Sequence, residues 1–447
     1  MSSPRSGDRG DPQINLDETH DVGSEVGRVM KKRRISWETM LIVQLIAAAA
    51  VVQSYALCSP AQRQQSLNKL SASGGSPVVA VPRETPLVIE PLHDDPEVVS
   101  DEELAAVLAR IQPRFRKRAL TPNYVEHSLR TWGCQATFLD PKVMPGAAMK
   151  DFLVDHGQFL ASWGDKTPPL LQDRPHGVAI RWGQEDGASV HHDHWLACLT
   201  EAGVPLREPV FTPSQRGKVI DDVLQEALRD FRVDEIEIEW SALAFGLWIA
   251  PQKSWITANQ GREVSFDMIA ERLISGPKHF GTCLGTHRVY SLMVLVRLDD
   301  QHDILSDEAR ERAMDYLRSV RDLITASQFP DGHWSAHWMD GADALTNPMP
   351  DGIIDQVTAT GHHLEWLAIA PVELHPPREA IRKAADWLIQ TAAAQTKAEF
   401  VQRYTFFSHV GNALALWRKT HPAEFWKKWD AEHPPVAEPE SAPPVAK

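Results

Sequence analysis

Two kinds of apolar pattern alternate along residues 101–430. Six segments place apolar residues on one helical face and charged residues on the other, which predicts amphipathic helices at 101–112, 146–163, 214–231, 264–275, 307–327 and 377–395. Six intervening segments are apolar on all sides and rich in small residues, at 123–137, 187–202, 235–249, 282–298, 355–370 and 402–418. A helix that is apolar all round must be covered all round. We therefore predict an all-α fold, an (α/α)6 toroid in which outer helices enclose inner ones, with a helical solenoid as the alternative.

The segments outside this region have other patterns. Residues 1–34 are polar and predict a disordered cytoplasmic tail, which ends in the basic run Lys31–Arg34. Residues 35–57 predict a transmembrane signal-anchor helix, because an apolar stretch of about 20 residues spans a bilayer. The basic residues before it place the N-terminus in the cytoplasm and the main domain outside, in the periplasm. Residues 58–100 predict a flexible linker and 431–447 a disordered tail, which leaves 101–430 as the toroid domain.

Other processing routes exist for the apolar N-terminal segment. A cleaved signal peptide would use Ser54-Tyr-Ala56 as its small-residue cleavage site. A lipoprotein attached at Cys58 is disfavoured, because Leu57 is too large for that processing. The long polar tail favours an uncleaved anchor. We therefore expect the membrane to be a partner of the chain through this helix.

Charge and cysteine spacing exclude some function classes. The formal net charge of −14 argues against nucleic acid as a partner. No CxxC pair is present, so a structural zinc site of ordinary spacing is not expected. We expect Cys134, Cys198 and Cys283 to be buried free thiols. A Cys134–Cys198 disulfide remains an alternative if the domain is extracytoplasmic.

The inner segments carry ionisable groups in their first halves. Inner helices of a toroid run parallel, so these groups lie at corresponding depth near one rim, where helix N-termini favour anions. Burying them is costly unless they are paired or line a wet pocket. One shared pocket for a small molecule or glycan explains all of them, whereas satisfied core histidines are the structural alternative. The predicted catalytic residues are His362, Glu365, Glu239 and His287, and the predicted substrate-binding residues are His191, His194, Arg288, His409 and His127.

The roles follow from residue type and spacing. His362 and Glu365 are three residues apart on one helix and share a face, as a base and its orienting acid would. Glu239 supplies a second carboxylate, and Arg288 suits an anionic group on a substrate. The histidines at 191, 192 and 194 do not share one face, and no H-E-x-x-H spacing occurs. No metal and no cofactor is therefore predicted.

A short motif resembles a known superfamily. The stretch Gln328-Phe-Pro-Asp-Gly-His-Trp334 resembles the QxxxGxW signature of squalene–hopene cyclases and of the wider terpenoid cyclase and prenyltransferase superfamily. The resemblance implies an α/α toroid, with Gln328, Gly332 and Trp334 as fold residues. The chain has one copy and no DxDD acid motif, and the prenyltransferase set of Asp, Cys and His for zinc cannot be placed. The stretch 299–303 fits DDxxD, but it lies at the C-terminal end of its helix and predicts a solvated loop.

A second resemblance concerns the fifth inner segment. The stretch Gly361-His-His-Leu-Glu-Trp366 is similar to a Gly-His-x-x-Glu segment of N-acylglucosamine 2-epimerase-type (α/α)6 barrels. It implies that His362 and Glu365 serve proton transfer at a sugar carbon. We thus expect a membrane-anchored toroid with acid–base chemistry on a saccharide or other polar anionic substrate. The alternatives are a non-catalytic binding or scaffolding toroid and a degenerate terpenoid cyclase-like protein.

Overall fold

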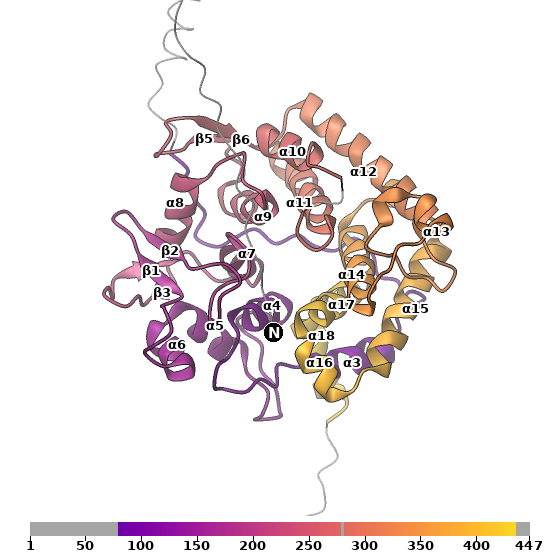
Figure 1. Cartoon of the computed structure of the whole chain (residues 1–447), viewed down its shortest axis with the longest axis horizontal. Coiled ribbons are helices and arrows are strands. Elements are labelled where there is room, and N and C mark those ends of the chain that lie inside the picture. Colours follow the sequence, from indigo (N-terminus) through magenta and orange to yellow (C-terminus); the bar gives the residue numbers. More distant parts are fainter. Residues whose placement is uncertain (1–78, 279–280, 435–447) are drawn as a thin grey trace, which may run out of the picture. The chain divides into compact units, whose positions relative to one another are not determined.

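Six buried helices form a closed ring in the computed structural model, which describes residues 79–278 and 281–434 (Figure 1). Each helix packs against the next one in the chain, and the sixth packs against the first. Each of the six predicted inner segments contains most or all of one of these helices, so the all-α prediction is confirmed. The ring helices are α4 (Pro122–Trp132), α7 (His194–Glu201), α9 (Ile238–Ile249), α11 (Thr286–His302), α14 (Ile353–Ile369) and α17 (Tyr404–Trp417).

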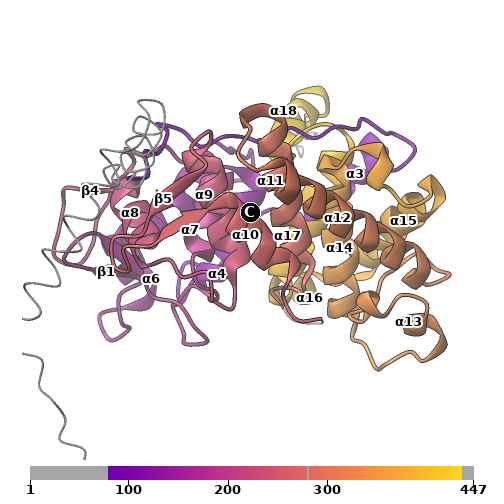
Figure 2. The same cartoon turned by 90° about the horizontal axis from the view of Figure 1, so that it is seen from above.

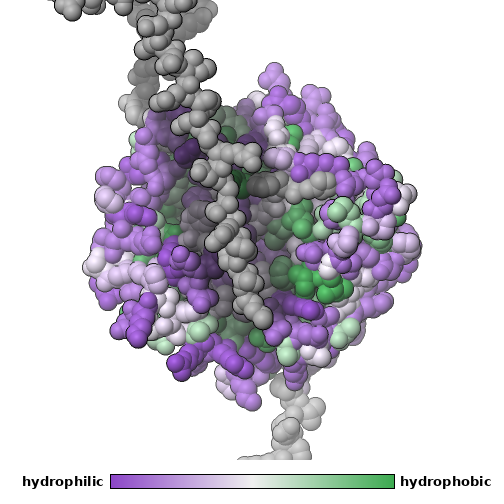
Figure 3. Space-filling model, in the orientation of Figure 1, coloured by the Kyte–Doolittle hydropathy of each residue, from purple (hydrophilic) through white to green (hydrophobic). Residues whose placement is uncertain are grey.

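Amphipathic helices surround this ring. Ser100, Ser265 and Ser306 cap the helices that follow them, because each hydroxyl accepts a backbone N–H of the first turn. The predicted helix at 146–163 is broken at Asp155, whose carboxylate caps a second helix. Hydrophilic residues cover much of the outer edge of the unit (Figure 3). The outer helices are α3 (Asp101–Arg110), α5 (Gly146–Val154), α6 (His156–Trp163), α8 (Ile220–Asp230), α10 (Phe266–Ile274), α12 (Asp307–Ser327) and α15 (Arg378–Ala394).

Short elements fill the connections between the rings. Three antiparallel hairpins join β1 (Leu171–Asp173) to β2 (Val178–Ile180), β3 (Pro209–Val210) to β4 (Lys218–Val219), and β5 (Ser254–Ile256) to β6 (Glu263–Ser265). Their strands have three residues at most, which is too short for a recognisable alternation of apolar and polar positions. Strand β4 and the turn before it occupy the first part of the helix predicted at 214–231. The remaining helices are η1 (Trp338–Asp340), α13 (Asp343–Thr346), η2 (Val372–Leu374), α16 (Lys397–Gln402) and α18 (Pro422–Glu432).

Residues 79–100, here called the strap, cross the C-terminal end of the ring (Figure 2). The backbone N–H groups of Arg83, Leu92 and Asp95 donate to carbonyls at the ends of α9, α14 and α17, at 3.0, 3.1 and 2.8 Å. Helix C-termini have free carbonyls that need such donors. The flexible-linker prediction does not hold for this part of the chain. Its backbone hydrogen bonds go to distant helices, and such pairing leaves no periodic pattern in the sequence.

The shared Ile-Ala-Pro endings of α9 and α14 lie under the strap. The Arg83 guanidinium donates to the Ala250 carbonyl at 3.2 Å, and a His93 ring nitrogen lies 2.9 Å from the Ala370 carbonyl. In both endings proline removes the N–H that would continue the helix. The repeated ending therefore provides two docking points for one segment.

The QxxxGxW stretch follows α12 and leads toward the ring, and its three signature residues make contacts expected of fold residues. The Gln328 amide donates to the carbonyls of Gly332 and Ala380, at 2.9 and 2.7 Å. Gly332 has φ 110°, and a Cβ there would meet the Lys383 carbonyl oxygen at 2.3 Å. The indole of Trp334 is fully buried and donates to Ile324. These contacts give the three signature residues a role in folding.

The predicted tail 1–34, membrane helix 35–57 and linker part 58–78 lie outside the described residues, as do residues 435–447 of the C-terminal tail. Among the described residues, no helix combines the length and the apolar character that a membrane crossing requires.

Candidate functional site

One aromatic side chain from each inner helix meets at the centre of the ring. Successive ring centroids around this closed layer are 4.6, 4.5, 4.1, 4.2, 3.9 and 5.0 Å apart. All six side chains are buried. We call this set the imidazole layer: His127, His194, Trp240, His287, His362 and His409. Its five histidines are all among the predicted site residues, whereas Trp240 is not.

Several ring nitrogens of this layer have no partner. Neither nitrogen of His287 is hydrogen-bonded, and Nε2 is unpartnered in both His362 and His409. By contrast, Nδ1 of His127 lies 2.8 Å from the Asn123 carbonyl. A buried polar group without a partner costs about 1–3 kcal/mol, and such groups often mark a missing ion or water. The layer is therefore incomplete as a purely structural cluster.

A second polar layer lies further toward the helix C-termini. It contains Arg130, Tyr290, Glu365 and Asn412, each three residues beyond a histidine of the imidazole layer, together with Glu201. We call it the arginine layer. The Arg130 guanidinium donates to Glu365 at 2.9 Å and to Glu201 at 2.6 and 3.3 Å. Tyr290 donates to Glu201 at 2.7 Å, and Asn412 donates to Glu365 at 2.8 Å.

Glu365 joins the two layers. One of its carboxylate oxygens accepts from Arg130, and the other lies 2.6 Å from Nδ1 of His362 and 3.4 Å from Nδ1 of His409. Burial alone would raise the pKa of Glu365, but Arg130 and the two histidines hold it well below its usual range. The predicted His362–Glu365 pair is thus in hydrogen-bond contact. It fixes the His362 ring with Nε2 as the free atom.

Glu126 is a second buried carboxyl group, and its pKa shifts in the opposite direction to that of Glu365. It is fully buried beside His194, whose Nδ1 lies 2.6 Å from its carboxyl, and Ser189 donates to it at 3.1 Å. Burial raises the pKa of Glu126 to about 8, despite opposing effects of Ser189 and His191. Burial also lowers the pKa of His194 well below its usual value. At neutral pH a protonated Glu126 therefore donates to a neutral His194.

A loop with an uncommon backbone precedes α11. Gly281, Cys283, Leu284 and Gly285 all have positive φ, and the values of 49° at Cys283 and 64° at Leu284 are strained for residues with side chains. The donor atoms of Cys283, His287 and His362 all lie within 4.8 Å of one another. The set His362, Glu365 and His409 meets the same criterion, as does the more exposed set His192, Asp193 and Glu235.

The remaining predicted site residues lie around the centre or away from it. His191 pairs with Glu237 at 3.0 Å on the N-terminal side of the imidazole layer. Glu239 is buried, one of its oxygens accepts the Thr282 N–H at 2.7 Å, and the other has no hydrogen-bond partner. Arg288 donates to the carbonyls of Leu273 and Gly276 at the end of α10. The structure therefore gives Arg288 a capping position on an outer helix, not one at the predicted pocket.

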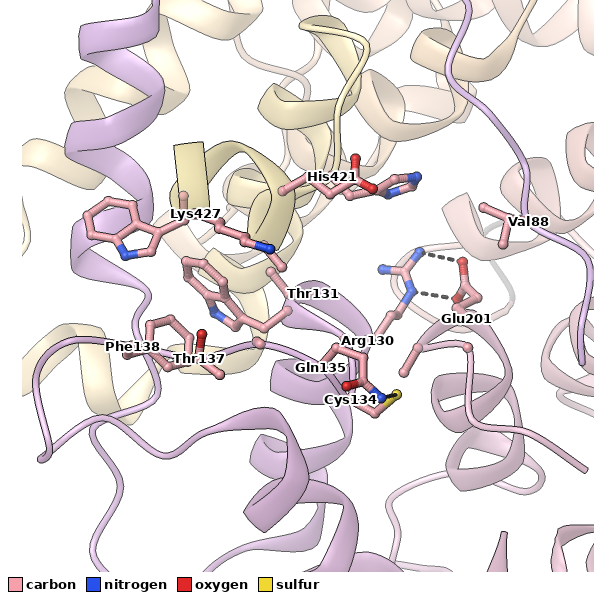
Figure 4. Close-up of a pocket in the computed structure, with 18 of the residues that line it drawn as sticks. Val88, Arg130, Thr131, Cys134, Gln135, Thr137, Phe138, Glu201, His421 and Lys427 are labelled. Atoms are coloured by element: carbon pink, nitrogen blue, oxygen red, sulfur yellow. Dashed lines mark hydrogen bonds and ion pairs between the residues drawn. The ribbon is translucent and has the colours of Figure 1, made fainter. Parts of the chain in front are cut away.

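A cavity of about 690 Å³ lies on the strap side of the ring (Figure 4). Arg130 and Glu201 form part of its wall, together with His421 and Lys427. The pocket predicted from the sequence was placed at the opposite rim. Arg130 thus lines this cavity and also contacts the buried Glu365.

Sequence reasoning missed Trp240 and most of the arginine layer. A helical signal was present, because Arg130, Tyr290 and Asn412 follow predicted histidines by three residues. Cys283 was not selected because it lies before the helix, in the loop. The three cysteines among the described residues are free thiols, so the Cys134–Cys198 disulfide is not formed. Comparison of the chain with family models, curated proteins and solved structures gives no match.

Proposed function

We propose that the chain is an enzyme that transfers protons to and from a polar substrate at the imidazole layer of an (α/α)6 toroid. The observation that carries this proposal is the pairing of two buried carboxyl groups of opposite character with one closed layer of histidines. Glu126 contacts the layer through His194, and Glu365 contacts it through His362. Groups whose surroundings push their protonation states apart can serve as acid and base at the same pH.

The roles divide between the two sides of the layer. Glu126 with His194 forms the proton-donating side, because its carboxyl stays protonated near neutral pH. His287 and His362 form the proton-accepting side. Their unpartnered ring nitrogens are free to interact with a reacting group, which would supply the missing hydrogen bonds. Glu365 orients His362 through Nδ1, as a carboxylate does for a catalytic histidine. Arg130 then acts as a positioning residue, because it holds Glu365.

The substrate approaches from the N-terminal rim in this proposal. His191, Glu237 and Cys283, which lie near the starts of α7, α9 and α11, are partly exposed there. The carboxylates of Glu235 and Glu237 at this rim disfavour an anion, and Arg288 is turned away. A neutral hydroxyl-rich compound such as a saccharide fits these groups better than the anionic substrate expected from the sequence. The predicted N-terminal helix would hold the toroid at the outer face of a membrane.

A non-catalytic scaffold is the second candidate function. The near-complete burial of the imidazole layer favours it, because a reacting atom needs access that the side chains must open. A degenerate terpenoid cyclase-like activity is less well supported. Its cation would require an aromatic, water-free wall, whereas one Trp and five His line this centre.

Solvent deuterium exchange tests the proposed enzyme. The full chain would be incubated in D₂O with a panel of neutral saccharides, and NMR would follow loss of carbon-bound protons, which needs no knowledge of the product. Glu126→Gln and Glu365→Gln should each slow exchange at least about 100-fold, the usual contribution of a positioned acid or base. Glu226→Gln is the matched control, since this buried carboxyl lies on outer helix α8.

Two results would separate the candidates. Exchange that persists at full rate in both Gln variants would remove these carboxyls from the reaction. No exchange with any saccharide of the panel, together with saturable binding of one of them, would favour the scaffold.

A further inference from the structure

We propose that Cys283, His287 and His362 form a binding site for a zinc-like divalent cation. The inference deepens the proposed function and rests on it only for the ion's part in a reaction, in which His287 and His362 act as ligands and a water bound to the ion takes the proton-accepting role assigned to them above. The binding site itself stands on the geometry of these three residues. They come from the loop before α11, the first turn of α11 and the middle of α14, which are neighbours in the ring.

The unpartnered nitrogens are the first argument. His287 is 1% exposed with both ring nitrogens free of hydrogen bonds, and His362 is 0% exposed with Nε2 free. Their ring centroids are 4.2 Å apart. Two neighbouring imidazoles with three unpartnered ring nitrogens between them are costly for a fold to keep. A cation between them would replace one missing interaction at each ring.

The spacing of the donor atoms is the second argument. The sulfur of Cys283 and one nitrogen each of His287 and His362 lie within 4.8 Å of one another. Ligands of a tetrahedral zinc ion, with bonds of about 2.0–2.3 Å, are about 3.5 Å apart. Side-chain adjustments of about 1 Å would therefore close the site around an ion. Three protein ligands leave the fourth position to water or a substrate, as in catalytic zinc sites.

Glu365 is the third argument. Histidine ligands of metals usually donate their second N–H to a carboxylate or carbonyl, which fixes the ring and raises its basicity. Nδ1 of His362 lies 2.6 Å from Glu365, and this leaves Nε2 as the ligand atom. Arg130 and Asn412 in turn hold Glu365 at 2.9 and 2.8 Å. The carboxylate and the histidine of a carboxylate–histidine–metal arrangement are thus in place.

The loop before α11 presents the sulfur. Two successive non-glycine residues in the left-handed region, Cys283 and Leu284, store strain of about 1–3 kcal/mol each. A cation bound at this sulfur would hold it as the thiolate and release one proton. Sulfur and imidazole ligands together select a borderline-soft ion such as Zn²⁺ over Mg²⁺ or Ca²⁺.

Metal reconstitution of the full chain tests the site. The purified protein would be stripped with a chelator and titrated with Zn²⁺ or Co²⁺ alone, with bound metal counted by elemental analysis. We expect one tightly bound ion per chain. The Co²⁺ form should show a sulfur-to-metal charge-transfer band and the intense visible bands of tetrahedral coordination. Failure of the stripped wild-type chain to bind either ion would overturn the proposal.

Matched variants locate the ligands. Cys283→Ser should abolish the charge-transfer band, whereas Cys198→Ser, at a buried thiol beside His194, should retain it. His362→Gln should lower affinity at least tenfold, and His363→Gln should leave it unchanged, because the His363 ring packs on Trp334 and Trp338. Glu365→Gln should weaken binding 10- to 100-fold and preserve the band. A band that survives Cys283→Ser would contradict the ligand set.

A measurement on the wild-type chain covers variants that fail to fold. Alkylation of each cysteine would be followed by mass spectrometry, with and without Zn²⁺. Zinc should slow modification of Cys283 at least tenfold and leave that of Cys134 unchanged. Equal rates at Cys283 with and without zinc would overturn the proposal. Metal binding without saccharide exchange would leave the site intact and count against the proposed reaction only.

Discussion

The imidazole layer and the arginine layer are built by the same ring of helices, about one turn apart, yet their polar groups are satisfied very differently. In the arginine layer, Arg130 has two carboxylate partners, and Glu201 and Glu365 each have a further donor. In the imidazole layer, His287 has no hydrogen bond at all. A buried charge network whose members are all paired stabilises the fold, so we call the arginine layer the brace. A buried imidazole without partners is instead a candidate for ligand binding.

The contrast between the two layers shows how a polar centre can be stable and still hold unpartnered groups. The paired layer fixes the spacing of α4, α7, α11, α14 and α17, because its charges reach across the ring. The unpaired layer then lies on a rigid base, so its nitrogens keep their positions without bonds of their own. Glu365 belongs to the arginine layer through Arg130 and contacts the imidazole layer through His362.

The largest expected effect is loss of the brace. Arg130→Met leaves the buried Glu365 and the half-buried Glu201 without their cation, so the free energy of unfolding should fall by about 3–5 kcal/mol. Urea unfolding followed by circular dichroism measures it. Arg310→Met is the control, because Arg310 pairs with Asp299 and Asp300 near the surface and should cost less than about 1 kcal/mol. Equal losses in the two variants would remove the distinction between a brace and an ordinary ion pair.

Most members of the imidazole layer could be predicted from the sequence, because helix geometry determines which residues lie at the same depth. Parallel inner helices bring equal depths together, so His127, His194, His287, His362 and His409 could be grouped without coordinates. The same periodicity would have added Arg130 and Asn412, three residues further along. The hydrogen-bond partners of Arg288 could not be predicted from the sequence, because they are backbone carbonyls at the end of another helix. Every residue has a backbone carbonyl, so residue types do not reveal which one accepts.

Non-periodic segments set the other limit. The strap has no repeating apolar pattern, and its position depends on carbonyls at three distant helix ends. Cys283 lies near the two histidines because of the backbone dihedrals of the loop before α11. The sequence Gly281-Thr-Cys-Leu-Gly285 permits these dihedrals but does not require them. The fold was therefore predictable where periodicity decides it. The site was predictable only where its residues lie on those periodic helices.

The second prediction uses pH to test the proton-donating side of the imidazole layer. Glu126 has a pKa of about 8 in the folded chain against an ordinary value of 4.5, so the folded chain retains a proton that the unfolded chain loses between these values. Stability should therefore fall as pH rises from about 4.5 to 8, by about 2–4 kcal/mol. Glu126→Gln keeps a donor to His194 and lacks this dependence. Wild type and variant should match near pH 5, and the variant should be more stable at pH 9. Parallel stability curves would show that Glu126 is ionised in the fold.

The third prediction probes redundancy within the brace. Tyr290→Phe removes the hydroxyl that donates to Glu201 at 2.7 Å, while Arg130 continues to hold that carboxylate. The loss should be about 1.5 kcal/mol, typical of one hydrogen bond to a charged group. Tyr124→Phe is the matched control, because its hydroxyl donates to the Gln402 carbonyl in an exposed position and should cost less. A loss as large as that of Arg130→Met would mean that the network fails as one unit.

The smallest expected effect lies in the imidazole layer. It tests whether His287 is a structural residue or is available for a ligand. In metal-free protein, His287→Leu removes two unpartnered nitrogens and some ring contact with Trp240, at 4.1 Å between centroids. These terms oppose each other, so the free energy of unfolding should change by less than about 1 kcal/mol. Zinc at 100 times its dissociation constant should then stabilise the wild type by about 2.7 kcal/mol and leave the variant unchanged. A loss above about 3 kcal/mol without metal would make His287 a structural residue. The two layers would then be one brace, because a side chain that the fold needs for its own stability is not held ready for a ligand.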